Sequence, residues 1–318
     1  MEAVKQRIIV GNAPHVHSRT TTSVLMLDVI AALMPCVIAG TWLFGWGALG
    51  VVAISTVCCV VLEFAYQVIT KKPVRINDLS AVVTGIILGL NLPVGAPWWM
   101  ILVGALIAIV LVKQLFGGIG DNFVNPAIAA RAVLLASWPA RMTAGAYIIT
   151  KPGLMANAVD ALSGATPLAA GEGAVPMLDL LIGRIPGSIG EVCKIAILIG
   201  LAYLLIRKTI TWHIPVVMVG TFMLFSLIIG KDPIYQVLSG SILFGAVFMA
   251  TDYVTSPMTS LGKVIYAACA GLILALIRYF GSYPEGTTYA ILLANVFTPL
   301  IDRFTKRRVY GTGKSKEA

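Results

Sequence analysis

Residues 160–168, Asp-Ala-Leu-Ser-Gly-Ala-Thr-Pro-Leu, place two hydroxyls where a group could be attached to a side chain. Gly164 and Ala165 leave little bulk between the hydroxyls of Ser163 and Thr166. The proline that follows Thr166 disfavours a helical backbone there, so the threonine side chain is expected to stand out from an extended turn. By itself the pattern is more typical of a Ser/Thr turn or a helix cap, and its meaning depends on the rest of the chain.

A second polar set comes from two distant stretches of the sequence. Asn122 and Asn125 follow a glycine-rich segment, and their spacing would let them share one face of a helical turn. Asp252 follows a later apolar run and is the acid expected to lie opposite them. A carboxylate near membrane depth requires a partner or an ion. The alternatives are helix caps for the asparagines and a solvated loop position for the acid.

Two further acids, Asp28 and Glu63, lie within or at the edge of the first two apolar runs. Either could serve ion passage, although Glu63 is close enough to an end to reach the interface by its stem alone. The five cysteines and three histidines form no CxxC or HExxH pattern. An iron–sulfur or zinc site within this chain is therefore not expected, and the sequence assigns no metal.

The elements that position these residues are apolar. Of the 318 residues, 58% are hydrophobic and 12% are charged, and the mean hydropathy is +0.91. A soluble domain carries about 25% charged residues, so the chain is expected to be a polytopic membrane protein. The net charge of +9 fits cationic cytoplasmic loops better than nucleic-acid binding. The polar first twenty residues predict no cleavable signal peptide.

Ten apolar runs are candidate membrane spans. They fall at about 24–43, 47–69, 79–92, 97–116, 126–138, 188–206, 214–230, 235–250, 263–280 and 287–301. With the N-terminus inside, sixteen Lys and Arg fall on the inner side, Lys113 among them, and six on the outer side. The outer cations are Arg141, Lys151, Arg184, Lys194, Lys231 and Arg278. This bias places both termini in the cytoplasm and the polar gap outside.

The third, fifth, eighth and tenth runs are too short to cross the hydrocarbon as straight helices. They occupy matching positions in two sets of five, which is the pattern of an inverted repeat with broken helices. We therefore predict an all-α polytopic membrane fold of about ten helices in two inverted five-helix repeats. The expected units are a first half (1–138), an outer loop (139–187) and a second half with a basic cytoplasmic tail (188–318).

The chain resembles a known family of membrane proteins. The family contains the D component of the Rnf complex, an ion-translocating ferredoxin–NAD oxidoreductase, and the B component of the sodium-translocating NADH–quinone reductase. The matching pieces run in family order over nearly the whole chain: 75–81 with Thr84 and Gly85, 113–120 with 125–127, 160–166, 250–252 with 255–257, and 283–286 with Asn295 and 299–302. The short segment before the first run favours the Rnf side.

The resemblance implies that Thr166 carries FMN through a phosphoester bond. Asp160, Ser163, Gly164 and Ala165 would then be the motif that a separate flavin transferase recognises. The phosphate tether leaves the flavin ring free for electron transfer, while the protein sets its position and electrostatics. The resemblance also implies a fold like that of urea transporters.

The same resemblance implies the partners and the location. The partners are the other Rnf components (A, B, C, E and G-like), Na⁺ or H⁺, and the lipid bilayer of a bacterial inner membrane. In the quinone reductase a second flavin, riboflavin, lies near the positions matched here by Asn122, Asn125 and Asp252. That set is thus a candidate second flavin or ion site.

Two alternative functions remain open at this point. One is a protein like the B component of a sodium-translocating quinone reductase. The other is a channel or transporter for a small solute, because an inverted-repeat fold alone would suit either role. Flavin fluorescence of the denatured protein on a gel separates the electron carrier from the solute channel.

The charge bias generates a prediction about sidedness. Cysteine introduced at Ala170 should react with a membrane-impermeant thiol reagent in intact cells, whereas cysteine at Tyr310 should react only after lysis. The unsubstituted chain, with its five native cysteines, is the control for background labelling. Labelling of the Ala170 position only after lysis would reverse the topology and remove the basis of the repeat assignment.

Overall fold

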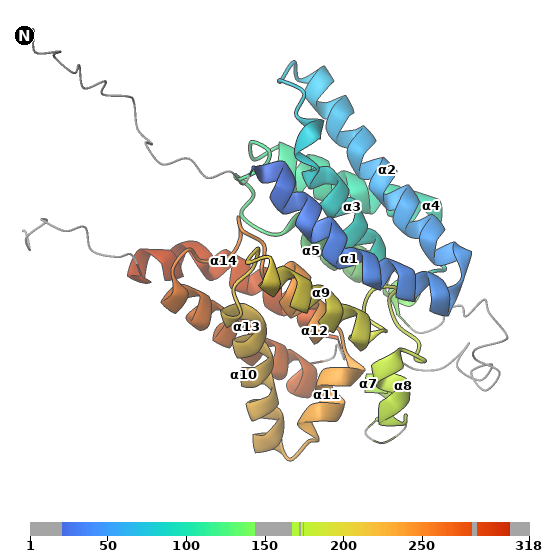
Figure 1. Ribbon diagram of the computed structural model, residues 1–318, viewed down its shortest axis with the longest axis vertical. Helices are drawn as coiled ribbons and strands as arrows, with labels where there is room; N and C mark the ends of the chain where they lie inside the picture. Colours follow the sequence, from blue (N-terminus) through green and yellow to red (C-terminus); the bar gives the residue numbers. More distant parts are fainter. Residues whose placement is uncertain (1–20, 144–166, 172, 174, 282–284, 306–318) are drawn as a thin grey trace, which may run out of the picture.

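The computed structural model describes most of the chain. The described residues are 21–143, 167–171, 173, 175–281 and 285–305. Every regular element within them is a helix. The chain begins its first helix at Thr22 and ends its last at Thr305 on the same side of the molecule, which we call the terminal face (Figure 1). The side that contains Gly45 and Pro167 is called the opposite face.

Three helices have the length and hydropathy to cross a bilayer. They are α1 (Thr22–Phe44), α2 (Trp46–Ile69) and α13 (Ser260–Phe280). The side chain of Thr21 caps the first turn of α1. Gly45 alone joins α1 to α2, and its φ of 84° is one that residues with a side chain rarely adopt.

The other helices are shorter or broken. They are α3 (Ser80–Leu90), α4 (Trp98–Leu106) with its π-helical continuation η2 (Ile107–Gln114), α5 (Pro126–Ser137), α9 (Lys194–Ile206), α10 (His213–Ile229) and α14 (Thr287–Thr305). The eighth apolar run is divided into α11 (Pro233–Ser239), α12 (Ile242–Phe244) and the π-helix η4 (Gly245–Met249). The connections contain η1 (Ile76–Asp78), α6 (Pro139–Met142), α7 (Pro167–Ala170) and α8 (Met177–Ile182).

Each predicted apolar run contains helix, but two predicted lengths are wrong. The third, fifth and eighth runs are short or broken, as expected. The tenth is not short, because α14 spans 19 residues and continues through Pro299 into polar positions that a hydropathy window excludes. The sixth is shorter than expected: α9 has 13 residues, because residues 185–192 are buried without helical structure.

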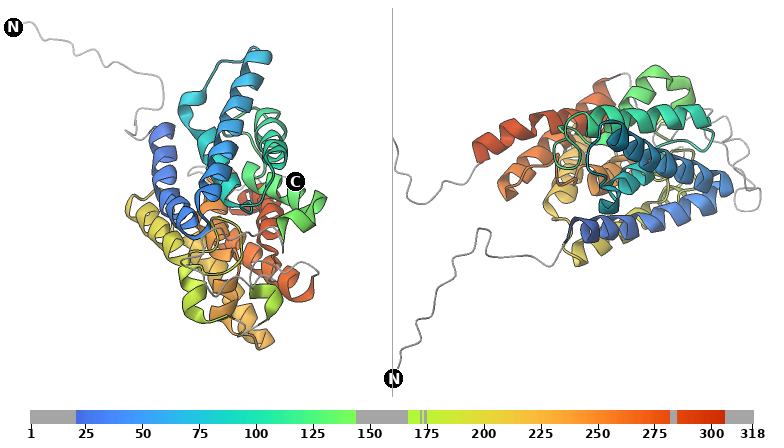
Figure 2. Two further views of the ribbon diagram at one scale, coloured as in Figure 1. Left: turned by 90° about the vertical axis from the view of Figure 1, so that its right-hand side faces the viewer. Right: turned by 90° about the horizontal axis from the view of Figure 1, so that it is seen from above.

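The two halves of the chain form neighbouring groups of helices, which Figure 1 and both views of Figure 2 separate by colour. α1 packs on α9 and α5 packs on α14, so the corresponding first and last helices of the halves meet. Within the halves, α2 packs on α4 and η2, and α10 packs on α13. The same pairing therefore recurs in both halves.

α1 packs tightly against α9 and against the 185–192 segment that precedes α9. A Cβ on Gly200 would lie 2.5 Å from the carbonyl oxygen of Ala32, and a Cβ on Gly40 would lie 2.6 Å from a methyl carbon of Ile189. Arg207 donates from Nε to Asp28 at 3.1 Å. Small residues allow this close approach of backbones, which is typical of helices that pack within membranes.

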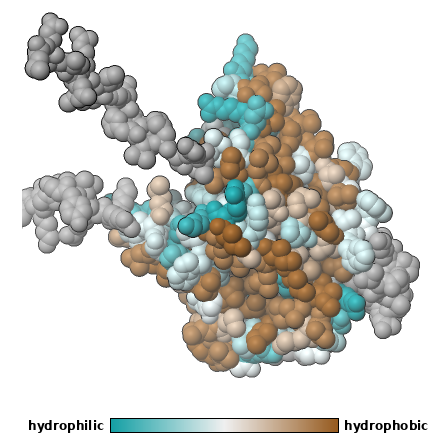
Figure 3. Space-filling model, viewed as in Figure 1, coloured by the Kyte–Doolittle hydropathy of each residue, from teal (hydrophilic) through white to brown (hydrophobic). Residues whose placement is uncertain are grey.

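Large apolar side chains cover much of the outer surface. Figure 3 shows this as a broad hydrophobic area over both halves. Examples are Ile38 of α1, Val57 of α2, Ile199 of α9 and Leu224 of α10, each more than half exposed. A soluble monomer rarely exposes apolar patches of this extent, so this surface is the one that faces lipid.

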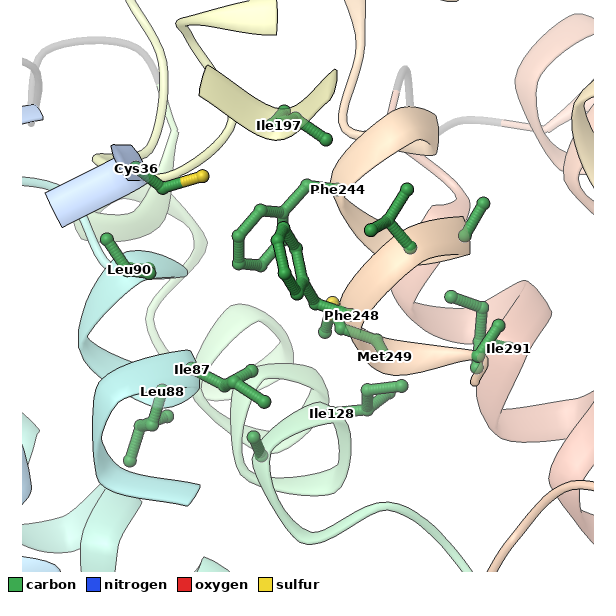
Figure 4. Packing of buried hydrophobic residues seen from close by; sticks show 14 of the residues in the cluster. Cys36, Ile87, Leu88, Leu90, Ile128, Ile197, Phe244, Phe248, Met249 and Ile291 are labelled. Atoms are coloured by element: carbon green, nitrogen blue, oxygen red, sulfur yellow. The ribbon is translucent and has the colours of Figure 1, made fainter. Parts of the chain in front are cut away.

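Aromatic side chains fill the centre between the halves. Phe244 and Phe248 have ring centroids 5.3 Å apart. Figure 4 shows them among aliphatic side chains of both halves, including Leu90 of α3, Ile128 of α5 and Ile197 of α9. The centre is therefore a packed apolar core.

The break after α3 lies inside the protein, and its backbone groups are satisfied there. The carbonyl oxygens of Leu90 and Leu92 accept hydrogen bonds from the amides of Gly190 (2.8 Å) and Ile189 (3.3 Å). The amide group of Asn91 donates to the carbonyl of Ile87 at 2.7 Å. Backbone groups that lose helical partners at membrane depth require such replacements, and the buried 185–192 segment provides two of them.

The break after α11 is satisfied by cations. Lys194 donates to the carbonyl oxygen of Gly240 at 2.9 Å, and Arg278 donates to that of Gln236 at 2.6 Å. Lys194 is 1% exposed and also bonds the carbonyl of Glu191. Cations are favourable at a helix C-terminus, where the last carbonyls carry partial negative charge.

Arg131 joins the first break to two acids. Its guanidinium donates to Asn91 at 2.5 Å, lies 3.0 Å from a carboxylate oxygen of Glu285 and lies 3.7 Å from one of Glu191. Arg131, Glu191 and Lys194 are all buried. The positive groups that support the helix breaks are thus compensated by carboxylates, as buried charges must be.

Removing this compensation should be costly. Arg131→Met would leave Glu191 and Glu285 without their shared cation, so we expect the free energy of unfolding to fall by about 3–5 kcal/mol. Arg184→Met is the matched control, because Arg184 is half exposed and lies 3.9 Å from Asp179, a pair whose loss costs about 0–1 kcal/mol. SDS titration followed by tryptophan fluorescence measures both. Equal stability of the two variants would contradict the role given to Arg131.

Candidate functional site

The hydroxyl-rich motif lies outside the described residues. Asp160, Ser163, Gly164, Ala165 and Thr166 precede the point at which the structure resumes, so their predicted role stays a prediction.

The residue after Thr166 is Pro167, the first of α7. α7 packs against α11, and the hydroxyl of Tyr235 donates to the carbonyl of Gly171 at 3.0 Å. The chain immediately after the motif is therefore held on the opposite face, beside the first turns of α11.

The structure brings Asn122, Asn125 and Asp252 together. All three line one cavity of about 90 Å³, together with Ser80, Thr84, Lys113 and Tyr253 and with apolar residues of α1, α3, α9 and η4. The cavity lies where α3 and α5 begin and where α9 and η4 end. Residues from both halves thus form one polar pocket, here called the two-half pocket.

The two asparagines do not share a helical turn, contrary to the prediction from their spacing. Asn125 is the N-cap of α5: its side-chain oxygen accepts from the amides of Ala127 (3.0 Å) and Ile128 (3.3 Å). Its amide group donates to the carbonyl of Met249, the last residue of η4, at 3.3 Å. The capping alternative is correct for Asn125, and the same side chain also joins the halves.

Asn122 is buried in the segment that leads to α5, where its amide group donates to the carbonyl of Val124 at 3.1 Å. Asp252 is half-buried directly after η4. Its carboxylate accepts from the hydroxyl of Thr255 at 3.1 Å and from backbone amides of Tyr253 and Val254. Among the described residues, no Lys or Arg lies within ion-pair distance of Asp252.

The lysine in the pocket wall is already paired. Lys113 lies 2.8 Å from Glu63 and donates to the hydroxyl of Ser80 at 2.6 Å, while Gln114 donates to the same carboxylate at 2.6 Å. Both donors belong to the π-helix η2, and π-helical turns are frequent at functional sites. The wider turn lets two consecutive side chains reach one acid of α2.

Glu63 and Asp28, the two acids proposed for ion passage, are both in strong interactions. Glu63 is 1% exposed, so the alternative in which its stem reaches the interface is wrong. Asp28 accepts from Arg207, from Thr209 at 3.2 Å and from Tyr203 at 3.3 Å. It connects α1 to the end of α9.

Sequence reasoning missed several charged residues of the interior. Lys113 and Lys194 were counted among loop cations, yet both are buried. Glu191 and Glu285 received no role, although Glu285 belongs to one of the matched family pieces. A signal was present for Lys113 and Lys194, because each lies within a predicted apolar run, 97–116 or 188–206, rather than in a polar loop. Within the described residues, no group of three or more His, Cys, Asp or Glu could hold a metal ion.

Comparison with known proteins decides the family. The family model described as "NQR2, RnfD, RnfE family" matches residues 9–311. The chain belongs to the NQR2, RnfD, RnfE family. It is 48% identical over 317 residues to the D component of the Na(+)-translocating ferredoxin:NAD(+) oxidoreductase complex of Acetobacterium woodii, a match that covers 98% of this chain and 97% of the relative.

Two more members of the NQR2, RnfD, RnfE family are similar over nearly their full length. The D component of the proton-translocating ferredoxin:NAD(+) oxidoreductase complex of Clostridium ljungdahlii is 39% identical, with 97% of this chain and 98% of the relative covered. The D component of the ion-translocating oxidoreductase complex of Halorhodospira halophila is 38% identical, with 94% of each chain covered. The translocated ion differs between the names of the three relatives: Na⁺ in the first, the proton in the second and an unspecified ion in the third.

Proposed function

We propose that this chain is the D component, a membrane subunit, of an ion-translocating ferredoxin–NAD⁺ oxidoreductase complex and that it carries electrons through FMN bound covalently to Thr166. The observation that carries the proposal is the match over nearly the whole chain to relatives that bear this name. The subunit is not catalytic alone. It contributes one electron-transfer step to a complex with other Rnf components, and a flavin transferase attaches its cofactor.

The residues beside Thr166 fit a phosphate-linked cofactor. Pro167 lines a pocket with Lys231 and Arg278, which supply positive charge where the phosphoester would lie. When bound, the flavin supplies the redox chemistry, and the chain's own residues set its position and electrostatic surroundings. On this proposal Thr166 supplies the hydroxyl oxygen of the ester, and Gly164 and Ala165 before it add little side-chain bulk.

The fold proposed for this role is a membrane domain of ten spans in two inverted repeats, with both termini in the cytoplasm of a bacterial cell. Its support is the recurrence of the same helix pairs in both halves, the broken third and eighth positions, and the apolar surface. On this topology the terminal face is cytoplasmic. The Thr166 motif and the two-half pocket then lie toward opposite sides of the membrane.

The ion that is coupled to electron transfer is Na⁺ or H⁺. The support for a coupling role is a line of polar groups through the interior. Asn125 of the two-half pocket contacts Met249, the amide of Asn91 lies 3.8 Å from the sulfur of Met249, and Asn91 contacts Arg131. The family resemblance also implies a second flavin, riboflavin, near this pocket, but a cavity of about 90 Å³ is too small for a flavin ring system and suits an ion better.

A solute channel fits the interior less well. The centre between the halves is packed with Phe244, Phe248 and Met249, and Arg131 and Lys194 occupy the helix breaks with their carboxylates. An occupied centre of this kind suits a protein that conducts electrons and small ions. The quinone-reductase alternative is separated from the proposal by the electron donor that reduces the flavin, NADH in that enzyme and reduced ferredoxin here.

Thr166 provides the first test of this proposal. Thr166→Ala, expressed with the flavin transferase, should lose all of the covalent flavin mass, because the ester oxygen is removed. Thr150→Ala, in the same polar gap, is the matched control and should keep the full mass. Intact-mass spectrometry and in-gel flavin fluorescence measure both. A flavin mass that persists in Thr166→Ala would refute attachment at this residue.

Asp252 provides the second test. Asp252→Ala should keep FMN on Thr166, because attachment occurs across the membrane. It should lower ferredoxin-driven NAD⁺ reduction and ion uptake by the assembled complex about tenfold, the loss expected for a charged hydrogen bond of at least ~1.4 kcal/mol. Asp302→Ala, an acid near the end of α14, is the control. Normal turnover in an assembled Asp252→Ala complex would show that the two-half pocket has only a structural role.

A further inference from the structure

A second pocket lies on the opposite face, directly after the Thr166 motif. It has a volume of about 180 Å³, and its wall includes Pro167, Leu168, Lys231, Tyr235, Arg278 and Tyr279. α7 forms one side, the start of α11 forms another, and the last turn of α13 forms the third. We call it the α7 pocket. It is too small for a flavin ring system but large enough for a phosphate group and its ester oxygens.

Arg278 is the charged group that this pocket is built around. It lies in the last turn of α13, and its guanidinium carbon is 4.7 Å from the centroid of the Phe222 ring. One terminal nitrogen donates to the carbonyl of Gln236 at 2.6 Å. Contacts with the ring and the carbonyl fix the orientation of the guanidinium plane, so its other donors point in defined directions.

The remaining donors of Arg278 lack acceptors. Within the described part of the chain, Nε and the second terminal nitrogen are buried and have no hydrogen-bond partner. Buried polar groups of a folded protein are nearly always hydrogen-bonded, and each exception requires an explanation, such as a bound water or ion. Glu285 and Glu191 do not fill this role, because their ion pairs within the same described residues are with Arg131.

Gly240 holds the guanidinium close to α7. A Cβ on Gly240 would lie 2.4 Å from the second terminal nitrogen of Arg278 and 3.3 Å from a methyl carbon of Leu168. A side chain at this position would displace the guanidinium group. Leu168 is two residues after Thr166, and consecutive Cα atoms are about 3.8 Å apart. Chain connectivity therefore keeps an ester on Thr166 close to the pocket wall that Pro167 and Leu168 form.

The anion that suits this arrangement is a phosphodiester. An arginine presents paired N–H groups in a planar fork that matches two phosphate oxygens. A phosphoester on Thr166 keeps one negative charge, and it would approach from the α7 side. Lys231, in the turn between α10 and α11, lines the same pocket and adds a second positive charge.

We propose that the α7 pocket, through Arg278 assisted by Lys231, binds the phosphodiester of the FMN attached to Thr166 and thereby fixes the position of the tethered flavin. This inference rests on the proposed function. Arg278 is a positioning residue: it holds the tether, while the ring remains outside the pocket. The tether alone would let the ring move over several ångströms, and binding its phosphate restricts that movement.

The test uses the complete complex, expressed with the flavin transferase. Arg278→Gln removes the charge and the guanidinium fork and keeps only a shorter amide donor, whereas Arg278→Lys keeps the charge without the fork. Arg184→Gln is the matched control, because Arg184 is a half-exposed cation of the preceding loop region that pairs with Asp179. Intact mass reports attachment. Time-resolved flavin anisotropy reports the fraction of flavin that is held, and ³¹P resonance reports the surroundings of the phosphate.

We expect all three variants to keep the covalent flavin mass. Arg278→Gln should lower the ratio of held to mobile flavin about tenfold, the change that ~1.4 kcal/mol produces, and should shift the ³¹P resonance toward that of an exposed phosphodiester. Arg278→Lys should give a smaller change in the same direction, and Arg184→Gln none.

Two outcomes would overturn the inference. One is wild-type anisotropy and ³¹P resonance in Arg278→Gln. The other applies if Arg278→Gln does not assemble: wild-type anisotropy and ³¹P resonance in both Arg278→Lys and Lys231→Gln. Absence of flavin mass from the wild-type chain would instead refute the proposed function. A flavin that is attached but indifferent to Arg278 refutes only its binding by the α7 pocket.

Discussion

The interior depends on one constraint: a helix that stops inside an apolar core leaves carbonyl groups that must find donors. The break after α3 is satisfied by the buried 185–192 segment and by Arg131, and the break after α11 by Lys194 and Arg278. Each cation in turn requires negative charge. Glu191 and Glu285 supply it for Arg131 and its neighbours. The charged centre is thus a consequence of where the helices end.

The two polar pockets follow from the same breaks. The two-half pocket forms where α3 and α5 begin and η4 ends, and Asn125 caps one helix while it bonds the last residue of another. The α7 pocket forms beside α11, and a carbonyl near the end of α11 accepts from only one of the donor nitrogens of Arg278. Relatives in the NQR2, RnfD, RnfE family are named as components of ion-translocating oxidoreductase complexes. The two-half pocket lies toward the terminal face, and the α7 pocket lies on the opposite face.

Hydropathy and charge predicted the helices well because spans must be apolar and continuous. The approach of Asn122, Asn125 and Asp252 was also predictable, since helix breaks attract polar residues. The partners of the interior charges were not: Lys194 lies within a predicted run, but a hydropathy window does not show which carbonyl groups it bonds. The length of α14 was underestimated because polar residues in its last turns lower the average hydropathy of a window there. Residues 188–192 were included in the sixth run because they directly precede its apolar residues, and hydropathy does not distinguish a buried loop from the start of a helix.

The α1–α9 seam has a consequence for movement. Ala32 of α1 packs on Gly200 of α9, Asp28 of α1 pairs with Arg207 at the end of α9, and Gly40 of α1 packs on Ile189 in the segment before α9. A seam with backbone-to-backbone contact and an ion pair allows little sliding, because packed interfaces do not deform continuously. Rocking of one half against the other, as in alternating-access carriers, would have to break all three contacts. Under the proposed function, ion passage would therefore rely on side-chain rotation and changes in local hydration within a rigid frame.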